Sequence, residues 1–220
     1  MSTALPRGAP AVELGDAGAR TGSRARLRGP RGNERLTAWA AAVLFVLLAI
    51  EGVTILRVSS LIVPHITVGL LLIGPVALKL ASTGYRFVRY YTGSAPYQQA
   101  GPPRLPLRVL APFLVVATLA VLATGIALLV EGPGHYGPWL LLHKASFIVW
   151  FAVATVHVLA YVGRVPRLIA KDLSRGRPRS SVRRSWARVG VTALAVLAGL
   201  ALVAATSTLV RPWLVVRGFG

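Results

Sequence analysis

The chain has 220 residues, of which 55% are hydrophobic and 14% charged, and its mean hydropathy is +0.64. Soluble domains are roughly 45–50% apolar and about 25% charged, so the composition excludes an ordinary soluble protein and a disordered one. The 25 Lys and Arg against 6 Asp and Glu give a net charge of +19, a balance that can indicate nucleic-acid binding. Cys is absent, which excludes disulfides, thiolate metal sites and covalent haem attachment.

Residues 1–36 are rich in Gly, Pro and Arg and show no apolar period. Such a composition cannot bury enough surface to offset the entropy of ordering, so we expect a disordered cytoplasmic tail. We expect residues 37–210 to form the membrane domain and residues 211–220 a short external tail.

Five long apolar segments follow the tail. Each is close to the ~20 residues that cross a bilayer core of about 30 Å. Open strand edges cannot be satisfied in lipid, so helices are the expected form. The sequence therefore predicts an all-α integral membrane bundle of five transmembrane helices, at about 37–56, 61–82, 109–130, 139–162 and 189–210.

The basic residues lie mostly on one side of these predicted spans. Residues 1–36, 83–108 and 163–188 carry 7, 4 and 9 Lys or Arg, 20 in all, against 3 on the other side. The positive-inside rule then predicts a multi-pass protein of the cell membrane with a cytoplasmic N-terminus and an external C-terminus. Every basic stretch flanks a span, so we expect membrane lipid as a partner and no nucleic acid.

Three of the four His lie in predicted spans, where an ionisable residue is expensive and indicates function. His143 and His157 are 14 residues apart, which places them about 40° apart around one helix and about 21 Å apart along it. His65 lies in a parallel span at the expected depth of His143. Two His at one depth on facing helices can supply both axial ligands of a haem iron. Another metal is a weaker interpretation, because zinc sites gather three or four ligands.

Other residues near this depth have plausible roles around such a site. Small residues allow close approach of the helices. Glu51 is expected to accept the second ring N–H of an axial His or a proton from a quinol, or else to pair with Lys144 or reach water on the outer side. Lys144 is expected to pair with haem propionates or to extend to the membrane edge. The small residues in question are Gly69, Gly74 and Gly125.

The His-x13-His spacing, opposite a His on a parallel helix, resembles the membrane-bound b-type cytochromes. The chain is similar over about 37–162 to the four-to-five-helix cytochrome b subunits that anchor respiratory oxidoreductases. The resemblance implies haem b, contact with a quinone pool and a partner oxidoreductase subunit. It is carried by His65-x3-Gly69, Leu142-His143-Lys144 and His157.

The chain departs from the two-haem members of that family, in which two helices each carry a His pair. The residue 14 after His65 is Lys79. The inner site is then vacant, five-coordinate through His157, or completed by Lys79. We expect Lys79 to extend to lipid phosphates and the chain to bind one haem, with a second as the alternative.

Motifs of stand-alone enzymes are missing from the sequence: it has no nucleophile triad, Walker motif, dinucleotide fingerprint or paired carboxylates. An electron-transfer subunit is therefore favoured over a self-contained enzyme. Two alternatives remain: a transmembrane haem reductase of an external acceptor such as ferric iron, and a cofactor-free membrane protein whose His serve packing or a proton relay.

Overall fold

The computed structural model describes residues 28–101, 105–135, 137–174 and 179–215. Five helices in this part of the chain are long and apolar enough to cross a membrane, and no strand occurs in it, so the predicted all-α fold with five transmembrane helices is confirmed. Four shorter helices join or follow them. The long helices are α2 (Arg28–Leu56), α3 (Val58–Tyr91), α5 (Leu105–Glu131), α6 (Trp139–Tyr161) and α8 (Arg179–Ala205), and the short ones are α4 (Ala95–Gln99), α7 (Val165–Leu173), α9 (Ser207–Val210) and η1 (Arg211–Val215).

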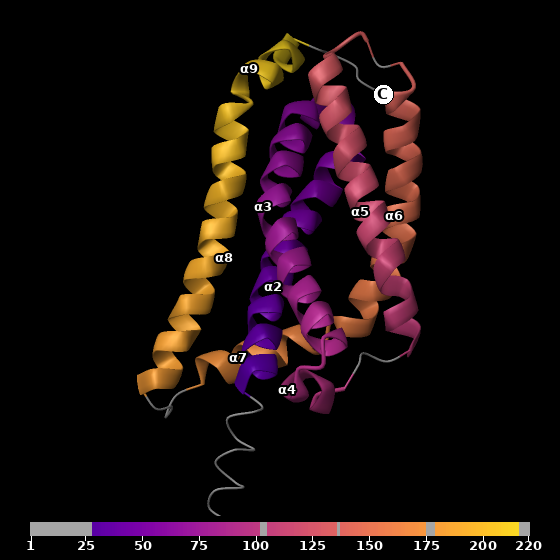
Figure 1. Cartoon of the computed structure of the whole chain (residues 1–220). Helices are drawn as coiled ribbons and strands as arrows, with labels where there is room; N and C mark the ends of the chain where they lie inside the picture. The colour runs from indigo at the N-terminus through magenta and orange to yellow at the C-terminus, as the bar shows by residue number, and fades with distance from the viewer. Residues whose placement is uncertain (1–27, 102–104, 136, 175–178, 216–220) are drawn as a thin grey trace, which may run out of the picture.

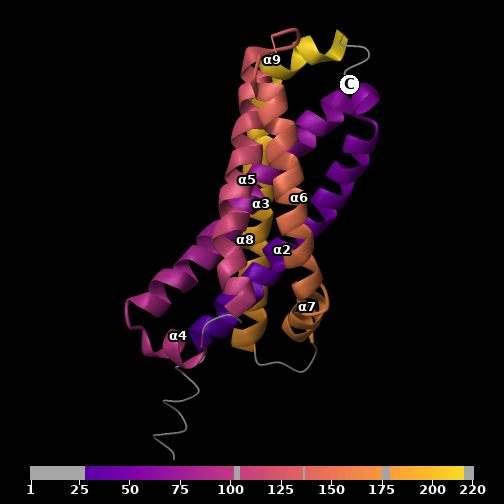
Figure 2. The same cartoon turned by 90° about the vertical axis from the view of Figure 1, so that its right-hand side faces the viewer.

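The long helices form two groups (Figures 1 and 2). Helices α2, α3 and α8 pack together and are called here the three-helix group, while α5 and α6 pack on each other as a hairpin. Contacts between the two groups are sparse and come mainly from α3 against α5. We call the boundary between them the seam, and it is where the candidate site lies.

Helix α2 begins at Arg28, well before the expected start of the first span at 37. Tertiary hydrogen bonds hold the additional turns: Asn33 Nδ2 donates to the Ser82 carbonyl at 2.8 Å, and the Thr37 and Ser82 hydroxyls are 2.9 Å apart. Residues 28–36 are therefore helical rather than part of a disordered tail, and residues 1–27 lie outside the described residues.

The expected external tail also contains structure. Trp213 in η1 is 2% exposed and packs with Ile62, Leu70 and Leu129 in an apolar cluster. This packing explains why η1 continues past the expected end of the last span, while residues 216–220 lie outside the described part.

Helices α3 and α8 approach unusually closely at two glycines. A Cβ on Gly74 would lie 1.9 Å from the Ala195 carbonyl oxygen, and a Cβ on Gly199 would lie 2.4 Å from the Leu71 carbonyl oxygen. No residue larger than glycine fits at either of these two positions. Gly74 therefore serves the contact between α3 and α8, not the approach to the His pair that the sequence suggested.

The loop at 163–188, expected only as a charge run, contains α7 and a buried carboxylate. Asp172 is 2% exposed and is the only acid in that loop. It accepts hydrogen bonds from side chains of α2 and α8, so α7 is fixed against both helices. The donors are Arg35 (3.2 Å), Trp39 (3.2 Å), Ser185 (3.0 Å) and Arg188 (3.0 Å from Nε).

The outer surface of the five long helices is apolar, as contact with lipid requires. Large apolar side chains are exposed on all of them, and in α6 the one buried residue is Ala154. The basic segments 86–101 and 164–174 lie at the same end of the bundle, with α4 and α7 (Figure 1). These features fit a multi-pass membrane protein whose lipid-facing surface spans all five helices.

Candidate functional site

The rings of His65 and His143 meet across the seam. His65 belongs to α3 and His143 to α6, and their ring centroids are 6.3 Å apart with an angle of 74° between the planes. Both residues are partly buried. The structure thus brings together the two His that the sequence placed at one depth.

Helix α2 supplies a carboxylate to His65. Glu51 Oε1 lies 2.9 Å from His65 Nδ1, and only 12% of the Glu51 side chain is exposed. The Thr54 hydroxyl, one helical turn along α2, donates to the Glu51 carbonyl at 2.7 Å and lies 3.2 Å from the same ring nitrogen. When Nδ1–H donates to the carboxylate, Nε2 carries the lone pair and can serve as a metal ligand.

Helix α5 supplies a hydroxyl to His143. Thr124 Oγ1 lies 3.1 Å from His143 Nδ1 and donates to the Ala120 carbonyl at 2.8 Å. A hydroxyl has a single proton, so it accepts from His143 Nδ1–H while it donates to Ala120. His143 Nε2 is then also left with its lone pair.

Two glycines leave room around these side chains. A Cβ on Gly125 would lie 3.1 Å from His143 Cε1, tighter than ordinary contact, and a Cβ on Gly69 would lie 3.6 Å from Glu51 Oε1. Gly125 and Gly69 are therefore beside the His pair, as the sequence suggested.

The spacing of the two rings would allow His65 and His143 to hold one haem iron between them. Two imidazoles that bind one metal ion through nitrogen have ring centres about 6 Å apart, because each metal–nitrogen bond is about 2 Å and each ring centre lies about 1 Å beyond its nitrogen. The observed 6.3 Å matches that separation. Haem iron binds His as a neutral imidazole through the ring nitrogen that carries the lone pair.

His157 does not join this pair. It lies 14 residues after His143 on α6, about 21 Å further along the helix. In the described part of the chain no three His, Cys, Asp or Glu side chains gather as a metal site would need. His65, His143 and His157 therefore do not make one metal centre.

The Lys79 side chain does not point in the direction that the sequence predicts. Its Nζ donates to the Thr37 carbonyl of α2 at 3.2 Å, so the side chain points into the three-helix group and not out to lipid phosphates. His157 Nδ1 is buried and has no hydrogen-bond partner among the described residues, and its ring centroid is 4.9 Å from that of Tyr161.

Of three further residues around the His pair, the sequence left one with alternative partners and did not indicate the other two. Glu51 pairs with His65 rather than with Lys144, which is exposed. Thr54 follows Glu51 by three residues and so shares its helix face, a spacing that could have indicated it. Thr124 precedes Gly125 and gave no comparable signal in the sequence.

Comparison with protein-family models, with curated proteins and with solved structures gave no match to this chain.

Proposed function

We propose that this protein is a membrane-bound b-type cytochrome in which His65 and His143 hold one haem b. Its function would be one-electron transfer between a quinone pool and a partner oxidoreductase. The supporting observation is the pair of imidazoles 6.3 Å apart across the seam, each with Nδ1 hydrogen-bonded to the protein. The haem, when bound, supplies the reversible one-electron chemistry.

The protein residues determine how such a group is held. The Glu51 carboxylate accepts the ring proton of His65 and so makes its Nε2 a stronger donor, while neutral Thr124 acts more weakly on His143. Lys144, which is exposed and follows His143 in the sequence, would pair with a propionate carboxylate.

We propose one haem for each chain, with Lys79 and His157 outside the ligand set. Lys79 would have to lose both its proton and its bond to the Thr37 carbonyl before it could bind iron. His157, with its unbonded Nδ1, remains the residue through which a second haem would attach.

The test is spectroscopic and uses the purified full chain. His65→Ala and His143→Ala should each abolish the low-spin reduced spectrum, because each removes one axial ligand. His135→Ala, in the outer loop, is the matched control and should retain the spectrum, as should His157→Ala. The expected haem-to-protein ratio is about one.

Two outcomes would contradict the proposal. If both His65→Ala and His143→Ala keep a wild-type spectrum, the ligand assignment is wrong. A ratio near two, with one haem lost in Lys79→Ala or His157→Ala, would place a second haem at the inner level.

The hydrogen bonds at the site also favour one rival function. The Glu51–His65 pair and the Thr124–His143 bond give each ring a hydrogen-bond partner at Nδ1 without any cofactor, as a packing or proton-relay role would require. Protein that inserts normally but carries no haem after expression with ample haem supply would favour this rival. Mixing reduced protein with a quinone analogue or with chelated ferric iron separates the electron-transfer subunit from a ferric reductase.

A further inference from the structure

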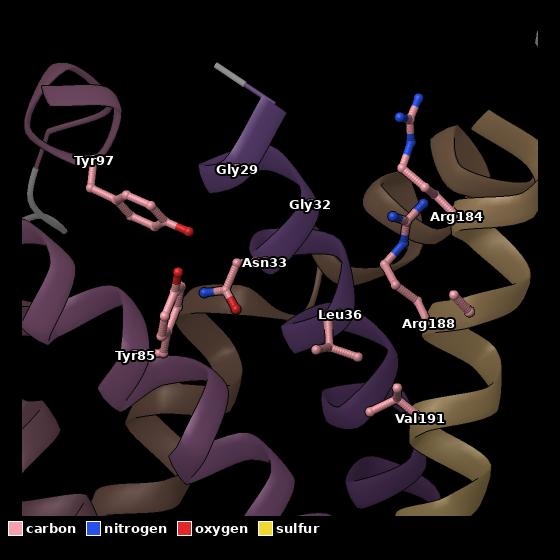
Figure 3. Close-up of a pocket in the computed structure, with 10 residues that line it drawn as sticks. Gly29, Gly32, Asn33, Leu36, Tyr85, Tyr97, Arg184, Arg188 and Val191 are labelled. Atoms are coloured by element: carbon pink, nitrogen blue, oxygen red, sulfur yellow. The ribbon is translucent and has the colours of Figure 1, made fainter. Parts of the chain in front are cut away.

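An open groove of about 370 Å³ lies at the end of the bundle that carries α4 and α7 (Figure 3). Helix α2 forms its floor with Gly29 and Gly32. Tyr85 of α3 and Tyr97 of α4 line one side, and two arginines of α8 line the other, namely Arg184 and Arg188.

The two glycines keep the groove open. A Cβ on Gly32 would meet nothing within 4 Å, and a Cβ on Gly29 would meet the Tyr97 hydroxyl at 3.6 Å. A larger side chain at position 32 would therefore fill the groove without clashing with the backbone of a neighbouring helix.

The tyrosine side of the groove offers hydroxyl groups. Tyr97 is 6% exposed, its ring is 5.9 Å from that of Tyr85, and the Arg89 guanidinium lies 6.0 Å from its centre. Burial raises the pKa of Tyr97, so its hydroxyl keeps its proton at neutral pH.

The arginine side carries positive charge where the groove opens. Arg188 is paired with the buried carboxylate of Asp172, which Arg35 also contacts. Arg184 is exposed at the rim and adds its guanidinium charge there. The groove is thus polar and cationic where it opens at the end of the bundle.

Towards the centre of the bilayer the lining becomes apolar. Leu36 of α2 and Val191 of α8 continue the groove along the spans. An occupant with a compact anionic head and an apolar tail would match both parts.

We propose that this groove binds an anionic phospholipid, with its phosphate at Arg184 and Arg188 and its acyl chains along Leu36 and Val191. Basic pockets between transmembrane helices on the cytoplasmic side are where such headgroups bind. The chain's own N-terminal segment is a poorer match, because residues 1–27 contain four Arg and two acids and so have the same sign of charge as the groove.

The experiment titrates phosphatidylglycerol into the full chain in neutral detergent and counts bound lipid by native mass spectrometry. One dominant site is expected for phosphatidylglycerol and none for phosphatidylcholine. Arg184→Gln should weaken binding about fivefold, which corresponds to ~1 kcal/mol for one basic residue near a membrane surface. Gly32→Leu should abolish the site by filling it.

Matched controls are Arg183→Gln, an exposed neighbour of Arg184 outside the groove, and Gly84→Leu, in open space on α3. Both should bind like the unaltered chain. If Arg183→Gln weakens binding as much as Arg184→Gln, the attraction is diffuse charge and the groove proposal is wrong. If inorganic phosphate competes at concentrations comparable to those of the lipid, the occupant is a free anion, which also overturns it. These measurements do not depend on haem.

Discussion

At the scale of single residues, two carboxylates hold polar side chains inside the bundle. Glu51 and Asp172 lie at opposite ends of the bundle, and each carboxylate binds a side chain from a helix other than its own. Their partners differ in kind. Glu51 binds an imidazole, which is charged only when both ring nitrogens are protonated. Asp172 binds two guanidinium groups, which are always charged. The two sites therefore respond differently to loss of the carboxylate.

Glu51→Gln should weaken the proposed haem site without preventing folding. The amide keeps the shape of the side chain but loses the charge that makes His65 a strong donor. Loss of such an outer hydrogen-bond partner lowers metal affinity roughly 10–100-fold. Haem titration of the apoprotein would measure the change, and the midpoint potential should rise because the oxidised iron loses more stabilisation. Glu131→Gln, an exposed acid at the end of α5, is the control and should leave both values unchanged.

Asp172→Asn should destabilise the end of the bundle that carries α7. Removing one partner of a buried ion pair costs about 3–5 kcal/mol, and we expect about 3 because Arg35 keeps 25% of its side chain exposed. Hydrogen exchange of α7 and thermal unfolding in detergent would report it. The control is Glu34→Gln, which removes a pair with the largely exposed Arg164 and should change stability by less than ~1 kcal/mol.

The same carboxylate determines a pH dependence. Burial alone would raise the pKa of Asp172, but bonds from Arg188, Trp39 and Ser185 and the charge of Arg188 outweigh it and hold the pKa well below its usual range. A depressed folded-state pKa contributes stability above the unfolded value of about 4, and this is lost as pH falls through the folded pKa. Exchange protection of α7 should be flat from about pH 5 to 8 and should fall in stronger acid. Greater protection at pH 3 than at pH 6 would contradict the assignment.

At the scale of helices, the sequence predicts the spans well and their ends poorly. Apolar length alone identified all five long helices. The extension of α2 to Arg28 depends on bonds from Asn33 and Thr37 to Ser82, 49 and 45 residues away, which no local pattern encodes. Helix α7 was missed because its length is nine residues, too short for a span signal.

The candidate site was predictable to a similar degree. The positions of His65 and His143 in two parallel predicted spans placed them at one depth, but the expected close approach of the helices also attached Gly74 to them. A glycine on α3 can face either the hairpin or α8, and hydropathy does not distinguish the two neighbours. The sequence likewise does not indicate where the Lys79 side chain points. The group that it binds is a backbone carbonyl, and every residue has one.

Gly74→Ala should separate α3 from α8. The added methyl would lie 1.9 Å from the Ala195 carbonyl oxygen, so the helices must shift, at a cost of about 1–3 kcal/mol for overpacking. Thermal unfolding in detergent should show the loss. Gly84→Ala, with nothing within 4 Å, is the matched control and should be neutral or slightly stabilising. Equal stability of the two variants would contradict the close contact.

At the scale of the whole molecule, charge and an odd number of spans together predict the topology. Because five is an odd number of spans, the N-terminus and the C-terminus lie on opposite sides of the membrane. The 20 basic residues on one side against 3 on the other favour a cytoplasmic N-terminus.

Reporter fusions at both termini would test this topology. We expect a reporter active in the cytoplasm to work at the N-terminus and one active outside to work at the C-terminus. Reversing the asymmetry, by substituting the Arg of 164–188 with Gln while adding Lys to the 132–138 loop, should produce a mixed orientation. Both termini on one side would mean that one of the five helices does not cross the membrane.

The division into a three-helix group and a hairpin has a consequence for biosynthesis. Helix α8 follows α5 and α6 in the chain, yet its partner is α3. As the chain emerges from the ribosome, the α3 surface around Gly74 remains in contact with lipid until the hairpin has been made and inserted. The α5–α6 hairpin, by contrast, can pair as soon as it is synthesised. The ring of His143 therefore reaches the bilayer before the three-helix group that carries His65 is complete, and the contact of α3 with α8 is the last one between the long helices to form.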